Sequence, residues 1–69
     1  MQIEIKGYKV VHGSYAYKGL IADTLWGAED EIKDGKIYYP ERLIVTFVDH
    51  DGKIGSIEDF SKNFAFLKE

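Results

Sequence analysis

Residues 42–57, RLIVTFVDHDGKIGSI, are the stretch of this chain that decides its fold. The first half, Arg42–Asp49, is rich in Leu, Ile, Val and Phe, and apolar residues stand on both of its faces. Such a strand is typical of the centre of a sheet, covered on two sides. HDG then supplies a turn and KIGSI returns as the next strand, so the stretch predicts an antiparallel hairpin within a larger sheet.

The turn raises the question of a metal site, because Asp49, His50 and Asp51 all carry groups that bind divalent cations. Consecutive residues of a strand point to alternating faces, so these three side chains diverge. A calcium loop would also need acids where Lys53 and Phe60 stand. A hairpin turn needs only a glycine at positive φ and a short polar side chain, and both are present. The stretch therefore predicts a turn and no metal site.

Glycines divide the rest of the chain into short segments rich in Ile, Val, Tyr and Phe, which predicts many short strands. A first strand is expected at Ile3–His12, with a bulge or bend at Gly7. GSYAYKG, residues 13–19, is interpreted as a loop, and Leu20–Trp26 as the second strand. No long window has the 3.6-residue period of an amphipathic helix.

Two further segments complete the predicted sheet. Asp34-Gly35 suits a tight turn whose central residues need positive φ, which predicts a small excursion hairpin that ends at Pro40. SIEDFSKNF then predicts one helical or 3-10 turn across Glu58–Lys62, and Phe64–Leu67 is expected as the last strand. Residues 1–69 are therefore predicted to be a single, mostly β domain of five to six short antiparallel strands.

This element order, and GSIEDFSKNFAFL at residues 55–67 in particular, resembles the SH3-like small β-barrel superfamily. The resemblance implies a small barrel in which a one-turn helix precedes the last strand, and it places SYAY in the first long loop. Peptide-binding SH3 domains carry an acid-rich first loop, a tryptophan after the second loop and a proline in the helical turn. Here GSYAYKG, YYPERL and Ser61 stand at those places, so the resemblance does not imply recognition of proline-rich peptides.

Composition excludes several classes of function. The chain has no cysteine, which excludes disulfides, thiolate zinc sites and a cysteine nucleophile, and which fits a reducing cytoplasm. A net charge of −3 without a basic stripe does not favour nucleic-acid binding. The first ten residues lack the apolar core of a signal peptide, and no apolar run approaches the ~20 residues that span a bilayer. We expect a cytoplasmic protein without a membrane partner.

The sequence does not predict an enzyme. Ser14, Ser56 and Ser61 lack the context of an activated nucleophile, and no spacing brings His12 and His50 together as metal ligands. A chain of 69 residues also leaves little room for a ligand pocket of ~300 Å³ or more. We therefore expect no catalytic residue, no metal and no cofactor.

Aromatic and acidic residues are the strongest candidates for a binding site. The four phenylalanines are expected in the core, whereas the tyrosines and the tryptophan of the loops exceed what a small domain can bury. These loop rings are interpreted either as one partly exposed docking patch or as caps on the barrel ends that compensate for a small core. An acidic stretch is interpreted either as a solvated loop or as a patch that steers a basic partner. The predicted partner-binding residues are Tyr15, Tyr17, Trp26, Tyr38 and Tyr39, with Glu29, Asp30 and Glu31 adding charge.

These residues predict a non-enzymatic protein-interaction module. Small, acidic, cysteine-free chains are common among phage and mobile-element accessory proteins, including inhibitors of host enzymes, and a homodimer through an edge strand at Ile3–Lys6 is a close variant. The alternative is a nucleic-acid-binding small barrel whose loop rings stack on bases. In that alternative the phosphates would contact Lys6, Lys9, Lys18, Lys33 and Lys36.

Overall fold

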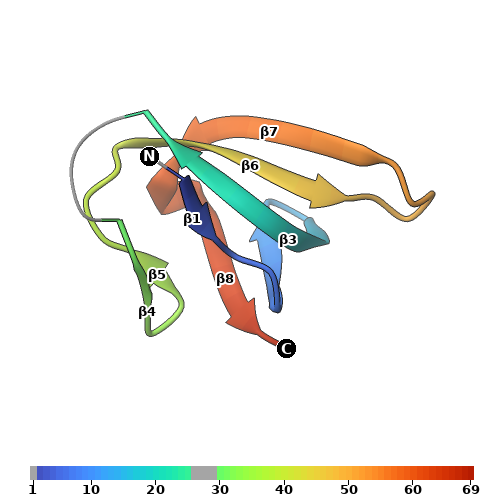
Figure 1. Ribbon diagram of the computed structural model, residues 1–69, viewed down its shortest axis with the longest axis horizontal. Coiled ribbons are helices and arrows are strands. Elements are labelled where there is room, and N and C mark those ends of the chain that lie inside the picture. The colour runs from blue at the N-terminus through green and yellow to red at the C-terminus, as the bar shows by residue number, and fades with distance from the viewer. Residues whose placement is uncertain (1, 26–29) are drawn as a thin grey trace.

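The computed structural model describes residues 2–25 and 30–69, and this part of the chain is almost entirely β-structure (Figure 1). Its strands are β1 (Gln2–Glu4), β2 (Tyr8–His12), β3 (Tyr15–Thr24), β4 (Ile32–Lys33), β5 (Lys36–Ile37), β6 (Arg42–Val48), β7 (Ile54–Phe60) and β8 (Phe64–Lys68). A 3-10 helix, η1 (Ser61–Asn63), joins β7 to β8. The predicted mostly β class, with one short helical turn before the last strand, is confirmed.

Six strands form one antiparallel sheet in the order β7-β6-β3-β2-β8, and β1 pairs with β3 beyond the end of β2. The predicted barrel does not close, because β7 and β8 remain the two edges of the sheet and no described residues of the two strands pair with each other. Only η1 separates these edges in the sequence. Asp59 of β7 bonds instead to His12 of β2, the strand next to β8.

The interpretation of residues 13–19 as a loop is wrong. Only Gly13 and Ser14 turn the chain, with Gly13 at φ 63°, and β3 begins at Tyr15. The tyrosines continue the ladder with β2, in which Tyr17 lies opposite Val10. Tyrosine alternates here with small or charged residues, which is itself a strand pattern. Because the turn is tight, β3 pairs with β2 from Tyr15 onward.

The predicted first strand, Ile3–His12, is divided by the bend expected at Gly7. Gly7 has φ 94°, and the N–H of Tyr8 donates to the C=O of Ile5 at 3.0 Å, which closes a turn between β1 and β2. Both halves pair with β3, so the bend redirects the chain without ending the sheet.

The core lies on one face of the sheet, where Ile5, Val10, Ala22, Leu43, Val45, Phe64 and Phe66 pack together. The prediction that β6 is covered on both faces is wrong: Leu43, Val45 and Phe47 are buried, but the residues between them are only half-buried. Phe60 was expected in the core and is instead 40% exposed, because the parity of β7 turns it to the outer face.

The β4–β5 hairpin and the helical turn both form close to where the sequence predicts them. Asp34 and Gly35 have φ values of 54° and 76°, which confirms the predicted turn between β4 and β5. The tip of this hairpin covers the edge of β8, since the N–H of Phe66 donates to the C=O of Gly35 at 3.4 Å. The helical turn begins later than the predicted Glu58, because β7 stays paired with β6 through Phe60 opposite Arg42.

Candidate functional site

The described candidate tyrosines form two separate groups. The rings of Tyr15 and Tyr17 stack with centroids 6.3 Å apart, and those of Tyr38 and Tyr39 lie 6.2 Å apart. The first pair stands at the start of β3 and the second between β5 and β6, which are at opposite ends of the long axis in Figure 1. Since the molecule measures 33 Å along that axis, the four described tyrosine rings do not make one patch, and Trp26, the fifth predicted ring, lies outside the described residues.

Tyr15 and Tyr17 belong to an aromatic ladder at one end of the sheet. Tyr17 stacks on Phe47 at a centroid distance of 4.0 Å and an interplanar angle of 28°. Phe47 is buried, Tyr17 is half-buried and Tyr15 is 68% exposed, so the ladder leads from the core to solvent. A tyrosine that is exposed but supported by stacking offers large contact area at a low cost in entropy.

The ladder lines an open groove of about 560 Å³, which we call the aromatic groove and define by Tyr15–Lys18 and Phe47–His50. The groove forms because β3 and β6 diverge: their ladder ends at Lys18 opposite Val48. A groove of this size corrects the expectation that so short a chain lacks room for a ligand. Sequence reasoning missed it because the point of divergence depends on strand pairing.

The backbone of Tyr15–Tyr17 borders this groove with one side unpaired. On the other side these residues pair with β2, in a register that places Tyr15 opposite His12. Alternate N–H and C=O groups of this stretch therefore face the groove without a partner strand. An extended segment of another molecule can bond to that backbone while its side chains pack on the rings.

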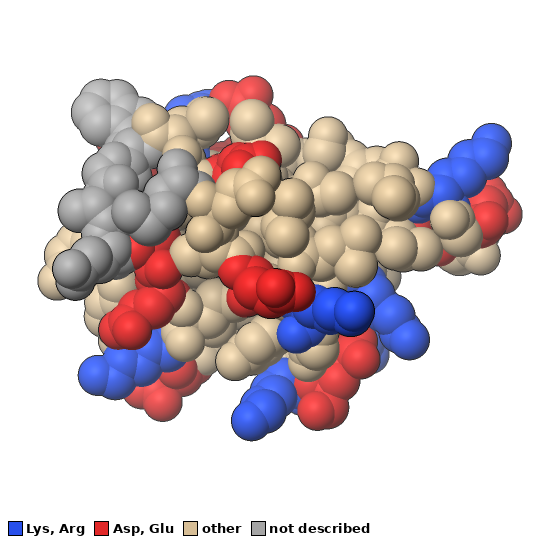
Figure 2. Space-filling model, viewed as in Figure 1, with Lys and Arg blue, Asp and Glu red and all other residues tan. Residues whose placement is uncertain are grey.

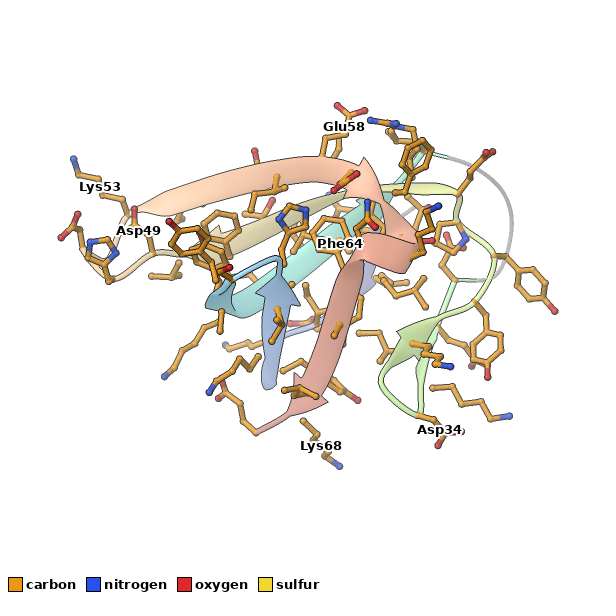
Figure 3. The ribbon with its side chains drawn as sticks, turned by 180° about the vertical axis from the view of Figure 1, so that it is seen from behind. Asp34, Asp49, Lys53, Glu58, Phe64 and Lys68 are labelled. Atoms are coloured by element: carbon orange, nitrogen blue, oxygen red, sulfur yellow. The ribbon has the colours of Figure 1, made fainter. Side chains whose placement is uncertain are left out.

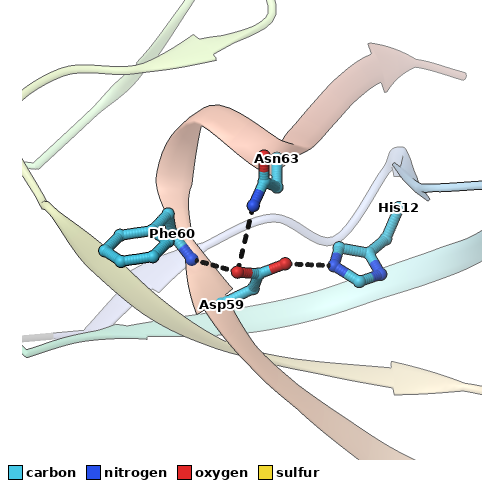
Figure 4. A network of polar contacts seen from close by, with 4 residues as sticks. All are labelled: His12, Asp59, Phe60 and Asn63. Carbon is cyan, nitrogen blue, oxygen red and sulfur yellow. Dashed lines mark hydrogen bonds and ion pairs between the residues drawn. The ribbon is translucent and has the colours of Figure 1, made fainter.

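A histidine–aspartate pair lies beside the groove (Figure 4). Nε2 of His12 donates to Oδ2 of Asp59 at 2.7 Å, and the His12 ring packs on Phe64 at a centroid distance of 4.8 Å. Oδ1 of Asp59 accepts hydrogen bonds from the N–H of Phe60 at 2.7 Å and from Nδ2 of Asn63 at 3.0 Å. These contacts tie β7 and η1 to β2 across the open side of the sheet.

The same contacts set the charge of Asp59. The hydrogen bond from His12, followed by those from the Phe60 N–H and from Asn63, lowers the pKa of Asp59 from 3.8 to about 2. Within residues 2–25 and 30–69, no hydroxyl bonds to His12, so the pair does not form the nucleophile–base arrangement of acyl transfer. The pair links β2 to β7, and no spacing in the sequence predicts a contact across 47 positions.

The described residues contain no cluster of three or more potential metal ligands. Oδ1 of Asp49 accepts the N–H groups of Asp51 and Lys53, each at 2.9 Å, and Gly52 has φ 80°. The predicted turn at Asp49–Gly52 is therefore confirmed. Nε2 of His50 lies 3.6 Å from Oδ2 of Asp51, so His50 has a different acidic partner from His12.

The predicted acidic residues have different environments. Trp26 and Glu29 lie outside the described residues. Glu31 is exposed, whereas Asp30 is only 8% exposed, which does not fit the interpretation of this position as part of a solvated loop. The carboxylate oxygens of Asp30 have no hydrogen-bond partner within the described part of the chain.

The edge predicted for a homodimer, Ile3–Lys6, is shorter than expected, since β1 covers only Gln2–Glu4 and the chain turns at Lys6. Within the described ranges, no helix is long and apolar enough to cross a membrane. Comparison with known proteins found no matching family model, no matching curated protein and no matching solved structure.

Proposed function

We propose that this protein is a non-enzymatic interaction module that docks a protein partner in the aromatic groove. The observation that carries the proposal is the ladder Tyr15–Tyr17–Phe47, whose outer ring is 68% exposed although it stacks on a ring that is half-buried. The groove combines these rings with unpaired strand backbone, which suits an extended peptide segment with apolar side chains.

We also propose a biological setting for this protein. A cytoplasmic accessory protein of a phage or mobile element, acting as an inhibitor of a host enzyme, agrees with the small size, the acidic composition and the lack of cysteine. The SH3-like superfamily is the family we propose, and the order of the strands with η1 before β8 supports it.

Nucleic-acid binding is the less favoured function because, of the predicted lysines, Lys18 alone lines the aromatic groove. Lys9 pairs with Lys18 across β2 and β3, and strand alternation places both on the face opposite Tyr17. Lys33 and Lys36 pair on the distant β4–β5 hairpin. On the face seen in Figure 2, acidic and basic side chains alternate along the lower edge without forming a basic stripe.

Matched tyrosine variants test the proposal. Tyr15→Asn removes the exposed ring of the groove, and Tyr39→Asn removes a ring at the other end that is 80% exposed, against 68% for Tyr15. We expect a pull-down from host extract with the Tyr39 variant to recover the wild-type partner, and the Tyr15 variant to lose it. A folded Tyr15 variant that captures the same protein would overturn the proposal. Tight binding of single-stranded DNA at about 50 mM salt, lost as salt rises, would favour the nucleic-acid function instead.

A further inference from the structure

The outer edge of β7 is long, regular and uncovered in the described part of the chain. β7 ends the sheet, and among the strands of residues 2–25 and 30–69 only β6 pairs with it. Its register with β6 runs unbroken from Ile54 to Phe60, without the bulge or proline that commonly protects an exposed edge. The opposite edge differs, because the β4–β5 turn covers β8. An open, regular edge is a template for one more strand.

The alternation of hydrogen bonds along the β6–β7 hairpin identifies which backbone groups of β7 face away from β6. The N–H of Asp49 donates to the C=O of Lys53 at 2.8 Å, which fixes the alternation of the β6–β7 ladder. The N–H and C=O groups of Ile54, Ser56 and Glu58 therefore point outward. Phe60 follows the same parity, but its N–H is already bonded to Oδ1 of Asp59.

We propose that two copies of this chain associate through this edge, with the two β7 strands antiparallel around a two-fold axis at Ile57. In this register Ile54 of one copy lies opposite Phe60 of the other, and Ser56 lies opposite Glu58. Ile54 is 72% exposed and Phe60 is 40% exposed, so both apolar side chains gain a partner. The Ser56 hydroxyl donates to the Glu58 carboxylate, which satisfies the polar pair as well.

Contacts within one copy already fix the positions of Glu58 and Phe60 on this edge. The guanidinium of Arg42 lies 4.7 Å from the centre of the Phe60 ring, and its Nε lies 3.4 Å from Oε1 of Glu58. Figure 3 shows Glu58 projecting from the outer side of β7. Side chains that are ordered before association lose less entropy when the second copy binds.

The neighbouring registers are less favourable. A shift in one direction places Glu58 opposite Glu58, where like charges repel across the pair. A shift in the other direction places the apolar Ile54 opposite Glu58 and leaves Phe60 without a partner. The two-fold register at Ile57 alone pairs apolar with apolar and donor with acceptor, which is why we commit to a second copy as the occupant.

A proline variant tests this association. The Ser56 N–H is not used by the β6 ladder, so Ser56→Pro keeps the monomer's own bonds but removes a donor from the edge. Sedimentation from micromolar to millimolar protein should show a dimer for the wild type and a weaker dimer for the matched Ser56→Ala variant, which loses the hydroxyl bond but keeps the backbone N–H. We expect the dissociation constant of Ser56→Pro to rise at least ~10-fold above that of Ser56→Ala. A wild type that stays monomeric throughout, or a folded Ser56→Pro that dimerises equally well, would overturn the proposal.

Hydrogen exchange of the wild type supplies a second measurement if the proline variant does not fold. Protection of the Ser56 and Glu58 amides should increase with protein concentration, whereas concentration-independent exchange of both amides contradicts the proposal. Tyr15→Asn leaves this edge intact and should dimerise like the wild type. Failure of the groove and failure of the edge are therefore distinguishable.

Discussion

The Asp59 side chain joins separate elements of the fold through hydrogen bonds. It links β7 to His12 of β2 and to Asn63 of η1, and it also accepts the N–H of the next residue. Its three hydrogen-bond donors favour the ionised carboxylate, which lowers the pKa of Asp59 to about 2. The folded state therefore gains stability from this residue whenever the carboxylate is charged.

The pH dependence of folding should report this contact. A carboxyl whose pKa is lower in the folded state stabilises that state above its unfolded pKa, and the contribution is lost as pH falls through the folded value. For Asp59 that window runs from the ordinary 3.8 down to about 2. We expect Asp59→Asn to be less stable than the wild type at neutral pH and to lose less stability across this window.

Urea unfolding at a series of pH values measures this difference. Glu41→Gln, which removes an exposed carboxylate with no ion pair among the described residues, is the matched control and should keep the wild-type dependence. Identical slopes for the wild type and Asp59→Asn between about pH 4 and 2 would show that the contact is not formed in solution.

Gly19 is required by close packing inside the core. A Cβ at this position would lie 2.6 Å from Cγ2 of Val10 and 2.7 Å from Cδ1 of Ile5, both of which are buried. We expect Gly19→Ala to lose ~1–3 kcal/mol of unfolding free energy through overpacking. Gly55→Ala, whose Cβ would meet the Phe47 ring at 3.3 Å, should lose less. Chemical denaturation of both variants checks the order.

At the scale of elements, the β4–β5 hairpin protects one edge of the sheet. Gly35 approaches β8 so closely that a Cβ would lie 2.7 Å from the carbonyl oxygen of Phe66. Positive φ at Gly35 and a close backbone approach both require glycine here. The hairpin therefore needs glycine at this position for its backbone contact with β8.

Substitution of Gly35 should detach the hairpin from β8. We expect Gly35→Ala to cost ~1–3 kcal/mol, because alanine is strained at φ 76° and meets the Phe66 carbonyl. Exchange of the Phe66 amide should then accelerate more than that of the core strands. Asp34→Asn is the control, since asparagine tolerates positive φ, and it should leave exchange unchanged. Equal protection of Phe66 in all three proteins would contradict the role of the hairpin.

At the scale of the whole molecule, the open sheet accounts for both candidate surfaces. β3, β6 and β7 extend toward one end, where the aromatic groove forms beyond the last pair of β3 with β6. β7 also ends the sheet with an uncovered edge. A closed barrel would have paired these groups internally, so the failure to close leaves them available to other molecules.

The small core limits the stability of this chain. A domain of 69 residues without disulfides should unfold with a free energy of only ~3–5 kcal/mol. Since the described residues hold no cluster of metal ligands, EDTA or added zinc should leave the melting temperature unchanged. Urea unfolding and thermal melts test both statements. A rise of several degrees with zinc would reveal a site that these residues do not form.

The sequence by itself determined the features that depend on local backbone chemistry. Short segments rich in Ile, Val and Phe predicted β6, β7 and β8, and Asp34-Gly35 predicted its turn, because β-propensity and positive φ are properties of neighbouring residues. The same logic identified Asp49–Gly52 as a turn. It was wrong at Tyr15–Lys18, where only the pairing with β2 shows that a glycine-flanked segment is strand.

Only the tertiary structure decided which groups meet and which remain exposed. His12 and Asp59 bond although they are 47 positions apart, and the described candidate tyrosines form two separate pairs. Phe60 faces outward although an apolar ring suggests a core residue. Each of these outcomes depends on where one strand extends beyond its paired strand and on which residues of the two strands lie opposite each other. Neither quantity is encoded in any single segment, because both arise from the packing of segments that are far apart in the chain.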